Sequence, residues 1–140
     1  MMDIRPLDGR LSASPQIAPE DMPAIAGAGF RSVVSNRPDG EGPDQPSAAE
    51  IEAAARETGL AFAHVPVVGG AIEKTDIDRF RQVVDDLPKP VLGFCRTGTR
   101  TTTLWALQHA GERSADELID VARAAGYDIS GLAPRLQAAK

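Results

Sequence analysis

The chain alternates short, strand-like runs with helices that begin at capping residues, and this alternation limits the folds that it can adopt. Runs rich in valine and aromatic residues, short enough to be buried strands, occupy 30–36, 60–67 and 90–95. Helices are expected between and around these runs, at 19–29, 47–59, 75–88 and 99–108. Strands that alternate with helices at this spacing predict an α/β fold with a central, mostly parallel sheet and helices on both faces.

The two ends of the chain depart from this alternation. Residues 4–14 predict one or two short edge strands, with Gly9 in the turn between them. At the other end, 114–126 and 130–140 predict two consecutive helices with no strand between them. We therefore expect a C-terminal helical cluster that packs on the sheet.

Length, charge and residue usage narrow the class of protein. At 140 residues the chain is long enough for one compact domain, predicted at 1–140, and too short for two. A net charge of -5 and a pI near 5.0 argue against nucleic-acid and membrane partners. The N-terminus lacks the order of a signal peptide, so we expect a soluble, cytoplasmic protein. One cysteine and two distant histidines give no zinc spacing, and we expect no metal or cofactor.

The only cysteine, Cys95, lies where a strand is predicted to end and a helix to begin. Its segment, 90–107, reads PVLGFCRTGTRTTTLWAL and contains no acidic residue. Gly98 allows backbone amides to turn inward, and the helix start adds its positive end, so the segment is suited to bind an anion and to favour a thiolate. Cys95 could instead be an inert, buried residue that ends a strand. The order strand, cysteine, glycine turn, arginine and helix favours the nucleophile.

Four stretches give the chain a resemblance to a known family: SASPQ, NRPDGE, HVP and PVLGFCRTGTRTTTLWAL. Over about residues 3–110 it resembles the bacterial beta-lactamase-hydrolase-like, protein-phosphatase-like domain, whose members are often described as sulfur transferases. The resemblance implies a cysteine-phosphatase-like fold, with Cys95 and Arg100 as catalytic residues at the two ends of the active-site loop. It leaves open whether the protein acts alone or beside a persulfide dioxygenase-type protein, as the family's fused forms suggest.

The number of residues between Cys95 and Arg100 distinguishes a phosphatase loop from a sulfurtransferase loop. Tyrosine phosphatases place five residues between cysteine and arginine, whereas this chain has four. The length and sequence of this loop are similar to those of the loop of rhodanese sulfurtransferases. The four, which we expect to bind the anion, are Arg96, Thr97, Gly98 and Thr99. A tighter ring suits one sulfur atom better than a phosphoryl group. We therefore expect a rhodanese-type sulfurtransferase that takes sulfur from a small-molecule sulfane-sulfur donor, carries it as a persulfide on Cys95, and passes it to a thiol or other acceptor.

Two alternatives remain. The first is a phosphatase that acts on a phosphate ester through a phosphocysteine on the same residue. The second is a non-catalytic oxyanion-binding or thiol redox-sensing module. The phosphatase needs a general acid for its leaving group, whereas release of sulfite from thiosulfate does not. Acidic residues available for that role are Asp39, Glu41, Glu73, Asp76 and Asp78.

Further residues are accessory candidates. Thr101 matches the hydroxyl residue that follows the arginine in the phosphatases, and its hydroxyl could donate to the thiolate. Arg37 follows a predicted strand and could reach the bound anion. Asp39 and Asp76 are the accessory acids, although a turn and a helix start explain them better. His64 is expected to be a packed histidine rather than a catalyst.

Overall fold

In the computed structural model, which describes residues 3–138, a five-stranded sheet forms the middle layer of the molecule. In their order across the sheet, the strands are β1 (Arg5–Pro6), β2 (Leu11–Ser14), β5 (Val91–Phe94), β3 (Ser32–Ser35) and β4 (Ala61–His64). Strands β2, β5, β3 and β4 run parallel, and β1 pairs antiparallel with β2. The predicted α/β class with a mostly parallel central sheet is confirmed.

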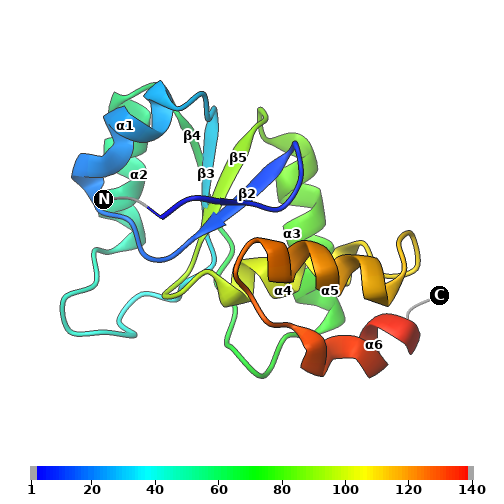
Figure 1. Cartoon of the computed structure of the whole chain (residues 1–140). Coiled ribbons are helices and arrows are strands. Elements are labelled where there is room, and N and C mark those ends of the chain that lie inside the picture. The colour runs from blue at the N-terminus through cyan, green and yellow to red at the C-terminus, as the bar shows by residue number, and fades with distance from the viewer. Residues whose placement is uncertain (1–2, 139–140) are drawn as a thin grey trace.

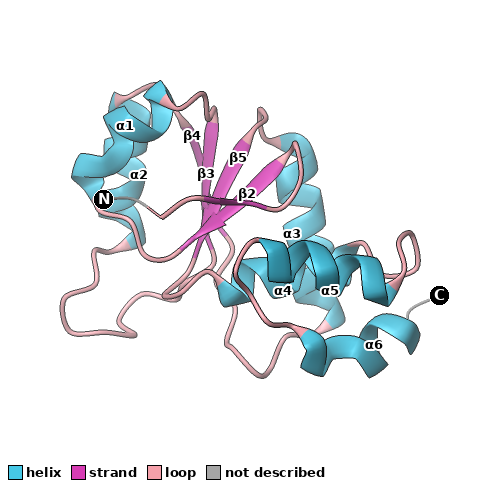
Figure 2. Ribbon diagram, viewed as in Figure 1, coloured by secondary structure: helices cyan, strands magenta, loops and turns pink. Residues whose placement is uncertain are grey.

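Helices cover both faces of this sheet (Figures 1 and 2). The α-helices are α1 (Met22–Gly27), α2 (Ala48–Glu57), α3 (Lys74–Asp86), α4 (Thr99–Gln108), α5 (Ala115–Ala124) and α6 (Ala133–Ala138), and short 3-10 helices are η1 (Pro19–Asp21) and η2 (Ser130–Leu132). Helices α1 and α2 lie on one face and α3 to α6 on the other, where α5 and α6 form the predicted C-terminal cluster. Within residues 3–138, no helix is both long and apolar enough to cross a membrane.

Each central strand contributes to two hydrophobic cores, because successive side chains of a strand point to opposite faces. Val33 and Leu92 pack with the residues of α1 and α2. Their neighbours Val34 and Val91 pack with the residues of α3, α4, α5 and α6. This accounts for the near-continuous apolar runs of the strands, which are buried on both faces.

The register of the parallel strands brings their carboxyl ends level with one another. Phe94 at the end of β5 is paired with Ser14 at the end of β2 and with Ser35 at the end of β3. Ser35 is in turn paired with His64 at the end of β4. The segments that follow these strands therefore begin at one edge of the sheet, where ligands bind in open α/β folds.

The N-terminal segment differs from the prediction. β1 is an edge strand, but β2 pairs with β5 on its other side and lies within the sheet. All four residues of β2 are buried, including Leu11 and Ala13. The small side chains of this strand are accommodated under α4, which contacts β2.

Burial predicts unequal effects for one substitution at two valines. Val84 on α3 is 1% exposed, whereas Val68 is 62% exposed. Val84→Ala should lower the free energy of unfolding by about 2 kcal/mol, because two buried methyl groups are lost and a cavity is left. Val68→Ala should change it by less than about 0.5 kcal/mol. Urea denaturation measures both, and equal effects would contradict the placement of α3.

Candidate active site

Cys95 directly follows β5, at the edge where the parallel strands end. Its Sγ accepts a hydrogen bond from the backbone N–H of Gly98 over 3.0 Å. Gly98 is the residue before α4, so this amide belongs to the positive end of that helix. Cys95 is 1% exposed, and the sulfur therefore interacts with the helix end in a partly dehydrated setting.

The carbonyl groups of the loop that follows Cys95 are held by partners outside the loop. The C=O of Arg96 accepts a hydrogen bond from the N–H of Gln16, which follows β2, over 3.2 Å. The C=O of Thr97 accepts one from the hydroxyl of Tyr127 over 3.2 Å. With these carbonyls fixed, the amide of Gly98 points to the sulfur, and the amide of Thr99 bonds to the hydroxyl of Thr97 over 3.4 Å.

Gly98 is required by the shape of the loop. Its φ of +99° lies in the left-handed region, and a Cβ at this position would collide with the phenol of Tyr127. Tyr127 is itself held by the guanidinium of Arg5, which lies 5.6 Å from the ring centroid and donates to the C=O of Ala125 over 2.9 Å. The C-terminal helical region thus supports the cysteine loop. Sequence analysis missed Tyr127, because it lies 30 residues from Thr97 and belongs to no motif.

Arg100, in the first turn of α4, forms a two-pronged ion pair with Glu41. Its Nη1 and Nη2 atoms donate to the two carboxylate oxygens over 2.6 and 2.8 Å, and Nη1 also donates to the C=O of Val67 over 3.1 Å. The same carboxylate accepts from Nε of Arg37 over 3.0 Å. One carboxylate therefore fixes two guanidinium groups at the edge of the sheet where Cys95 lies.

These contacts perturb the titration of both partners. The hydrogen bond from Arg100 lowers the pKa of Glu41 below its ordinary value, although desolvation by burial opposes this, and Arg37 adds to the lowering. The pKa of Arg100 is raised, first by its hydrogen bond to Glu41 and also by the charge of the Cys95 sulfur. Glu41 is thus held as a carboxylate, and the Arg100 cation is close enough to Cys95 to interact with it electrostatically.

Thr101 does not make the contact suggested by the resemblance. Its hydroxyl donates to Oδ1 of Asn36 over 2.7 Å, and its single proton is therefore not directed to the sulfur. Thr97 and Thr99 lie at the exposed rim of the loop, where their hydroxyl groups bond to each other over 3.0 Å. Thr101 instead links α4 to the residue that follows β3, and so fixes the start of α4 against the sheet.

Arg37 lies at the edge of the sheet where the cysteine loop begins, as predicted, but its guanidinium is already bonded to other side chains. It is 8% exposed, and besides Glu41 its Nη1 donates to Oε1 of Gln16 over 2.9 Å. Its own C=O is bonded to Nε2 of His64 over 2.9 Å, and since a carbonyl only accepts, that ring nitrogen carries a proton. His64 is therefore a structural partner of Arg37, as expected for a packed histidine.

The two accessory acids serve as caps. Oδ1 of Asp39 accepts from the N–H of Ala48 at the start of α2 over 2.8 Å. Oδ2 of Asp76 accepts from the N–H of Glu73, just before α3, over 2.9 Å. Both bonds satisfy amides at helix starts, which explains these residues without catalysis. The structure thus brings Cys95, Arg100, Arg37 and Glu41 to one edge and leaves Asp39 and Asp76 at helix termini.

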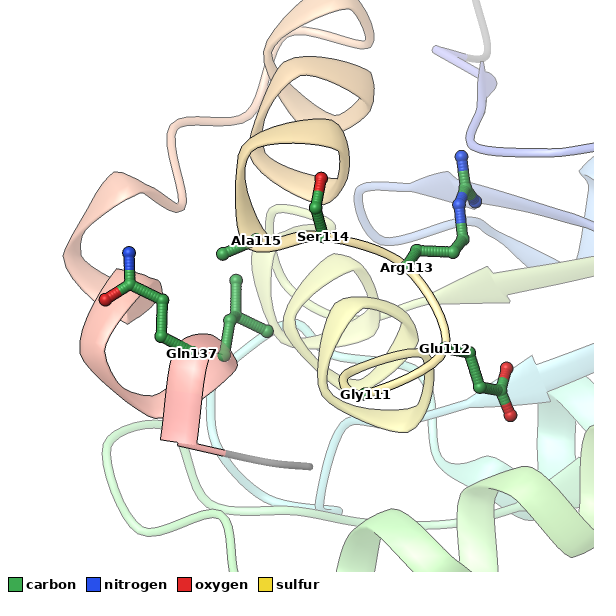
Figure 3. A pocket seen from close by; sticks show the side chains of 7 residues that line it. Gly111, Glu112, Arg113, Ser114, Ala115 and Gln137 are labelled. Carbon is green, nitrogen blue, oxygen red and sulfur yellow. The ribbon is translucent and has the colours of Figure 1, made fainter.

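Two pockets differ in their relation to this edge. One of about 530 Å³ adjoins the cysteine loop and is lined by Gln16, Arg37, Glu41, Gly42, Pro43, Asp44, Gln45 and Arg96. Another of about 690 Å³ lies beyond the C-terminal end of α4, between the segment from Gly111 to Ala115 and residues Leu136 and Gln137 of α6 (Figure 3). Since the cysteine loop precedes the N-terminal end of α4, the second pocket lies away from the site, whereas a third pocket of about 280 Å³ is lined in part by Thr99 and Arg100.

Comparison with known proteins agrees with this geometry. The family model described as "Beta-lactamase hydrolase-like protein, phosphatase-like domain" matches residues 3–112. A beta-lactamase hydrolase-like protein of Xylella fastidiosa is 37% identical over 130 residues, which are 91% of this chain and 30% of that protein. The chain thus spans about a third of the length of the curated relatives it matches.

Solved structures share the whole fold. A crystal structure of a candidate phosphatase from Neisseria meningitidis is 39% identical, covers 100% of both chains and has a TM-score of 0.92. The core catalytic domain of a PP-IP phosphatase from S. cerevisiae, in complex with citrate, has a TM-score of 0.72 at 18% identity, over 99% of this chain and 85% of that one. The predicted cysteine-phosphatase-like fold is confirmed.

The prediction of a rhodanese-type sulfurtransferase is wrong. It is overturned by the family description and by the Neisseria structure, which both point to phosphatases. The prediction took the length of the loop as decisive for the size of the bound anion. Arg100 and Arg37 also bring guanidinium groups to this edge, and the number of loop amides does not set the size of the anion. The sulfur donor and the persulfide dioxygenase-type partner lose their basis with it.

The Glu41 ion pairs predict a pH-dependent contribution to stability. The pKa of Glu41 lies below its ordinary value of 4.5 in the folded chain, so its stabilisation is present above 4.5 and is lost as pH falls through the folded-state pKa. Glu41→Gln should therefore lower the free energy of unfolding at neutral pH, and the difference from the unmodified protein should shrink below pH 4.5. Urea denaturation across about pH 7 to 3 measures it.

The matched control is Glu52→Gln, which removes the exposed partner of Arg56 on α2. It should change stability by less than about 0.5 kcal/mol at every pH. A Glu41→Gln effect that stays constant over the whole range would show that the carboxylate does not act through its charge.

Proposed function

Because the chain belongs to the family of the beta-lactamase hydrolase-like protein, phosphatase-like domain, we propose that it is a phosphatase that uses Cys95 as its nucleophile. The observation that carries this proposal is the bond from the Gly98 amide to Sγ of Cys95 at the start of α4, with the Arg100 cation close by. A helix end and a neighbouring cation both favour the thiolate, which is the nucleophilic form of cysteine. The family and the Neisseria structure support the same reaction class.

In the proposed reaction, the Cys95 thiolate attacks the phosphorus of a phosphate ester. The S–P bond forms while the bond to the leaving oxygen breaks, which gives a phosphocysteine. Water then attacks the phosphorus, the S–P bond breaks, and the thiolate and inorganic phosphate are released. The amides of Arg96, Thr97, Gly98 and Thr99 are proposed to bind the equatorial oxygens, because the loop carbonyls are already held outward.

Arg100 is proposed to bind the same oxygens through its fork of N–H donors. Glu41 positions it: the carboxylate fixes the guanidinium plane, and Arg37 and Arg100 share its charge. Glu41 is therefore a positioning residue, and Arg100 is proposed to touch the substrate.

The role of Cys95 predicts loss of activity on removal of the thiol. Cys95→Ser should lower turnover of p-nitrophenyl phosphate by about 10³-fold or more, since a hydroxyl is not ionised at neutral pH. Acid quenching of the unmodified protein during turnover should trap one phosphoryl group on Cys95, which intact-mass measurement detects. Thr58→Ser, at the C-terminal end of α2, is the control. A Cys95→Ser protein that keeps its turnover would remove Cys95 from the reaction.

Arg100 has paired N–H donors, and we predict that a positive charge without this pair does not support full activity. Arg100→Lys should lower kcat/KM for p-nitrophenyl phosphate by about 10²-fold, because an ammonium cannot supply the paired donors. Arg56→Lys, which makes the same change in an exposed ion pair on α2, should leave kcat/KM unchanged. Equal kinetics in the two lysine variants would place Arg100 outside the site.

A further inference from the structure

Two pockets border the cysteine loop, and they differ in the carboxyl groups that line them. The pocket of about 280 Å³, which Arg100 lines, has no acidic residue among those of 3–138 that line it. The pocket of about 530 Å³, which Arg96 lines, has Glu41 and Asp44. An acid that protonates the leaving oxygen of a phosphate ester must lie next to the bound phosphoryl group. Glu41 and Asp44 are therefore the two carboxyl groups to compare.

Glu41 is bound to cations through both carboxylate oxygens. Its Oε2 accepts from Nη1 of Arg100, and its Oε1 accepts from Nη2 of Arg100 and Nε of Arg37. The hydrogen bond from Arg100 above all lowers the pKa of Glu41, which disfavours the protonated form. Glu41 is therefore suited to hold cations and unsuited to deliver a proton.

Asp44 is exposed, and within residues 3–138 its carboxylate accepts no hydrogen bond and forms no ion pair. This distinguishes it from other aspartates that lie in turns of the chain. Oδ1 of Asp8 accepts from the N–H of Arg10 over 2.8 Å, and Oδ1 of Asp128 accepts from the N–H of Ser130 over 2.9 Å. A bond of this kind, to the backbone two residues on, is the usual role of aspartate in a turn. Since Asp44 makes no such bond, its carboxyl group is available to a bound substrate.

The turn that contains Asp44 is held in place by its neighbours. The C=O of Gly42 accepts from the N–H of Gln45 over 3.4 Å, which closes the turn around Asp44. Oε1 of Gln45 accepts from the N–H groups of Glu41 and Gly42 over 3.0 and 3.2 Å. Its Nε2 donates to the C=O of Pro38 over 2.8 Å. The backbone of Asp44 is thus fixed although its carboxylate has no partner of its own.

This turn is joined to the cysteine loop through two side chains. A Cβ on Gly42 would lie 2.9 Å from Nη2 of Arg37, so the turn lies against that guanidinium. Arg37 donates to Oε1 of Gln16 over 2.9 Å, and the N–H of Gln16 donates to the C=O of Arg96 over 3.2 Å. Asp44 therefore lines a pocket that is also lined by the residue directly after the nucleophile.

We propose that Asp44 is the general acid of this site and protonates the oxygen of the leaving group. The inference rests on the proposed phosphatase function and adds a catalytic residue to it. The phosphoryl group would lie in the cysteine loop, and the leaving group in the pocket of about 530 Å³. Sequence analysis considered five other acids and missed Asp44, because no local pattern joins this turn residue to Cys95.

The proton transfers balance over the two steps. The Cys95 thiolate forms an S–P bond while the ester P–O bond breaks with its electron pair on the leaving oxygen. That oxygen takes the proton of the Asp44 carboxyl group and departs as a hydroxyl compound. The Asp44 carboxylate then takes a proton from the attacking water, whose oxygen bonds to phosphorus. The S–P bond breaks with its electron pair on sulfur, which restores the thiolate and releases hydrogen phosphate, and Asp44 is protonated again.

Two substrates that differ in their need for a proton test the inference on the complete chain. Phenyl phosphate has to release a phenol, whose pKa is about 10, as for a tyrosine side chain. Dinitrophenyl phosphate releases a phenolate that two nitro groups stabilise as an anion. Asp44→Asn should lower kcat/KM for phenyl phosphate by about 10²-fold or more and leave that for dinitrophenyl phosphate within about threefold, because only the first reaction needs the proton.

Asp39→Asn is the matched control in the same loop, since the new amide oxygen can still accept from the N–H of Ala48. It should leave kcat/KM for both substrates within about twofold. Equal losses on the two substrates in Asp44→Asn, or none on either, would overturn the inference, as would an equal loss on phenyl phosphate in Asp39→Asn.

The unmodified protein separates a failure of the inference from a failure of the proposed function. Hydrolysis of both substrates is expected. If it hydrolyses dinitrophenyl phosphate and leaves phenyl phosphate intact, no acid acts on the leaving group, and the assignment of Asp44 is wrong while the phosphatase function stands. If it hydrolyses neither substrate, the phosphatase function is wrong and the inference with it.

Discussion

The position of β5 between two parallel neighbours is the constraint on which the site depends. Because β2, β5 and β3 end at the same level, the chain segments that follow them must meet at one edge. Gln16 then bonds to the loop carbonyl of Arg96, and Asn36 to the hydroxyl of Thr101. Each neighbour of β5 thus holds one side of the cysteine loop. A slip of register by one residue would break both bonds and exchange the side chains that the strands place in the two cores.

Basic side chains gather at this edge of the sheet, although the chain as a whole is negatively charged. The net charge is -5, yet this edge gathers Arg37, Arg96 and Arg100, and two of them share the carboxylate of Glu41. Glu41 lets two guanidinium groups lie close together in the absence of substrate, which their mutual repulsion would otherwise oppose. The same carboxylate thereby loses the ability to donate a proton, and the two functions exclude each other.

The sequence predicted those parts of the site that are local along the chain. Strand, cysteine, glycine turn and helix follow one another within a few residues, and periodicity and capping are sufficient to place them. The Glu41–Arg100 and Tyr127–Thr97 contacts join residues 59 and 30 positions apart, and no local pattern encodes them. The sulfurtransferase prediction failed for the same reason. Loop length is a local quantity, whereas Arg37 and Glu41 are brought to this edge by the fold.

The burial of Arg37 is the feature that the fold alone explains least. A guanidinium that is 8% exposed loses hydration, and its attraction to Glu41 offsets that loss only in part. An apolar residue packed at this position would stabilise the sheet edge at least as well. Burial next to the cysteine loop instead keeps a cation in a setting of low dielectric constant, where it acts more strongly on a nearby anion than it would in water. The cost in stability and the capacity to bind an anion thus have one physical origin, which is the removal of water from the edge where the strands end.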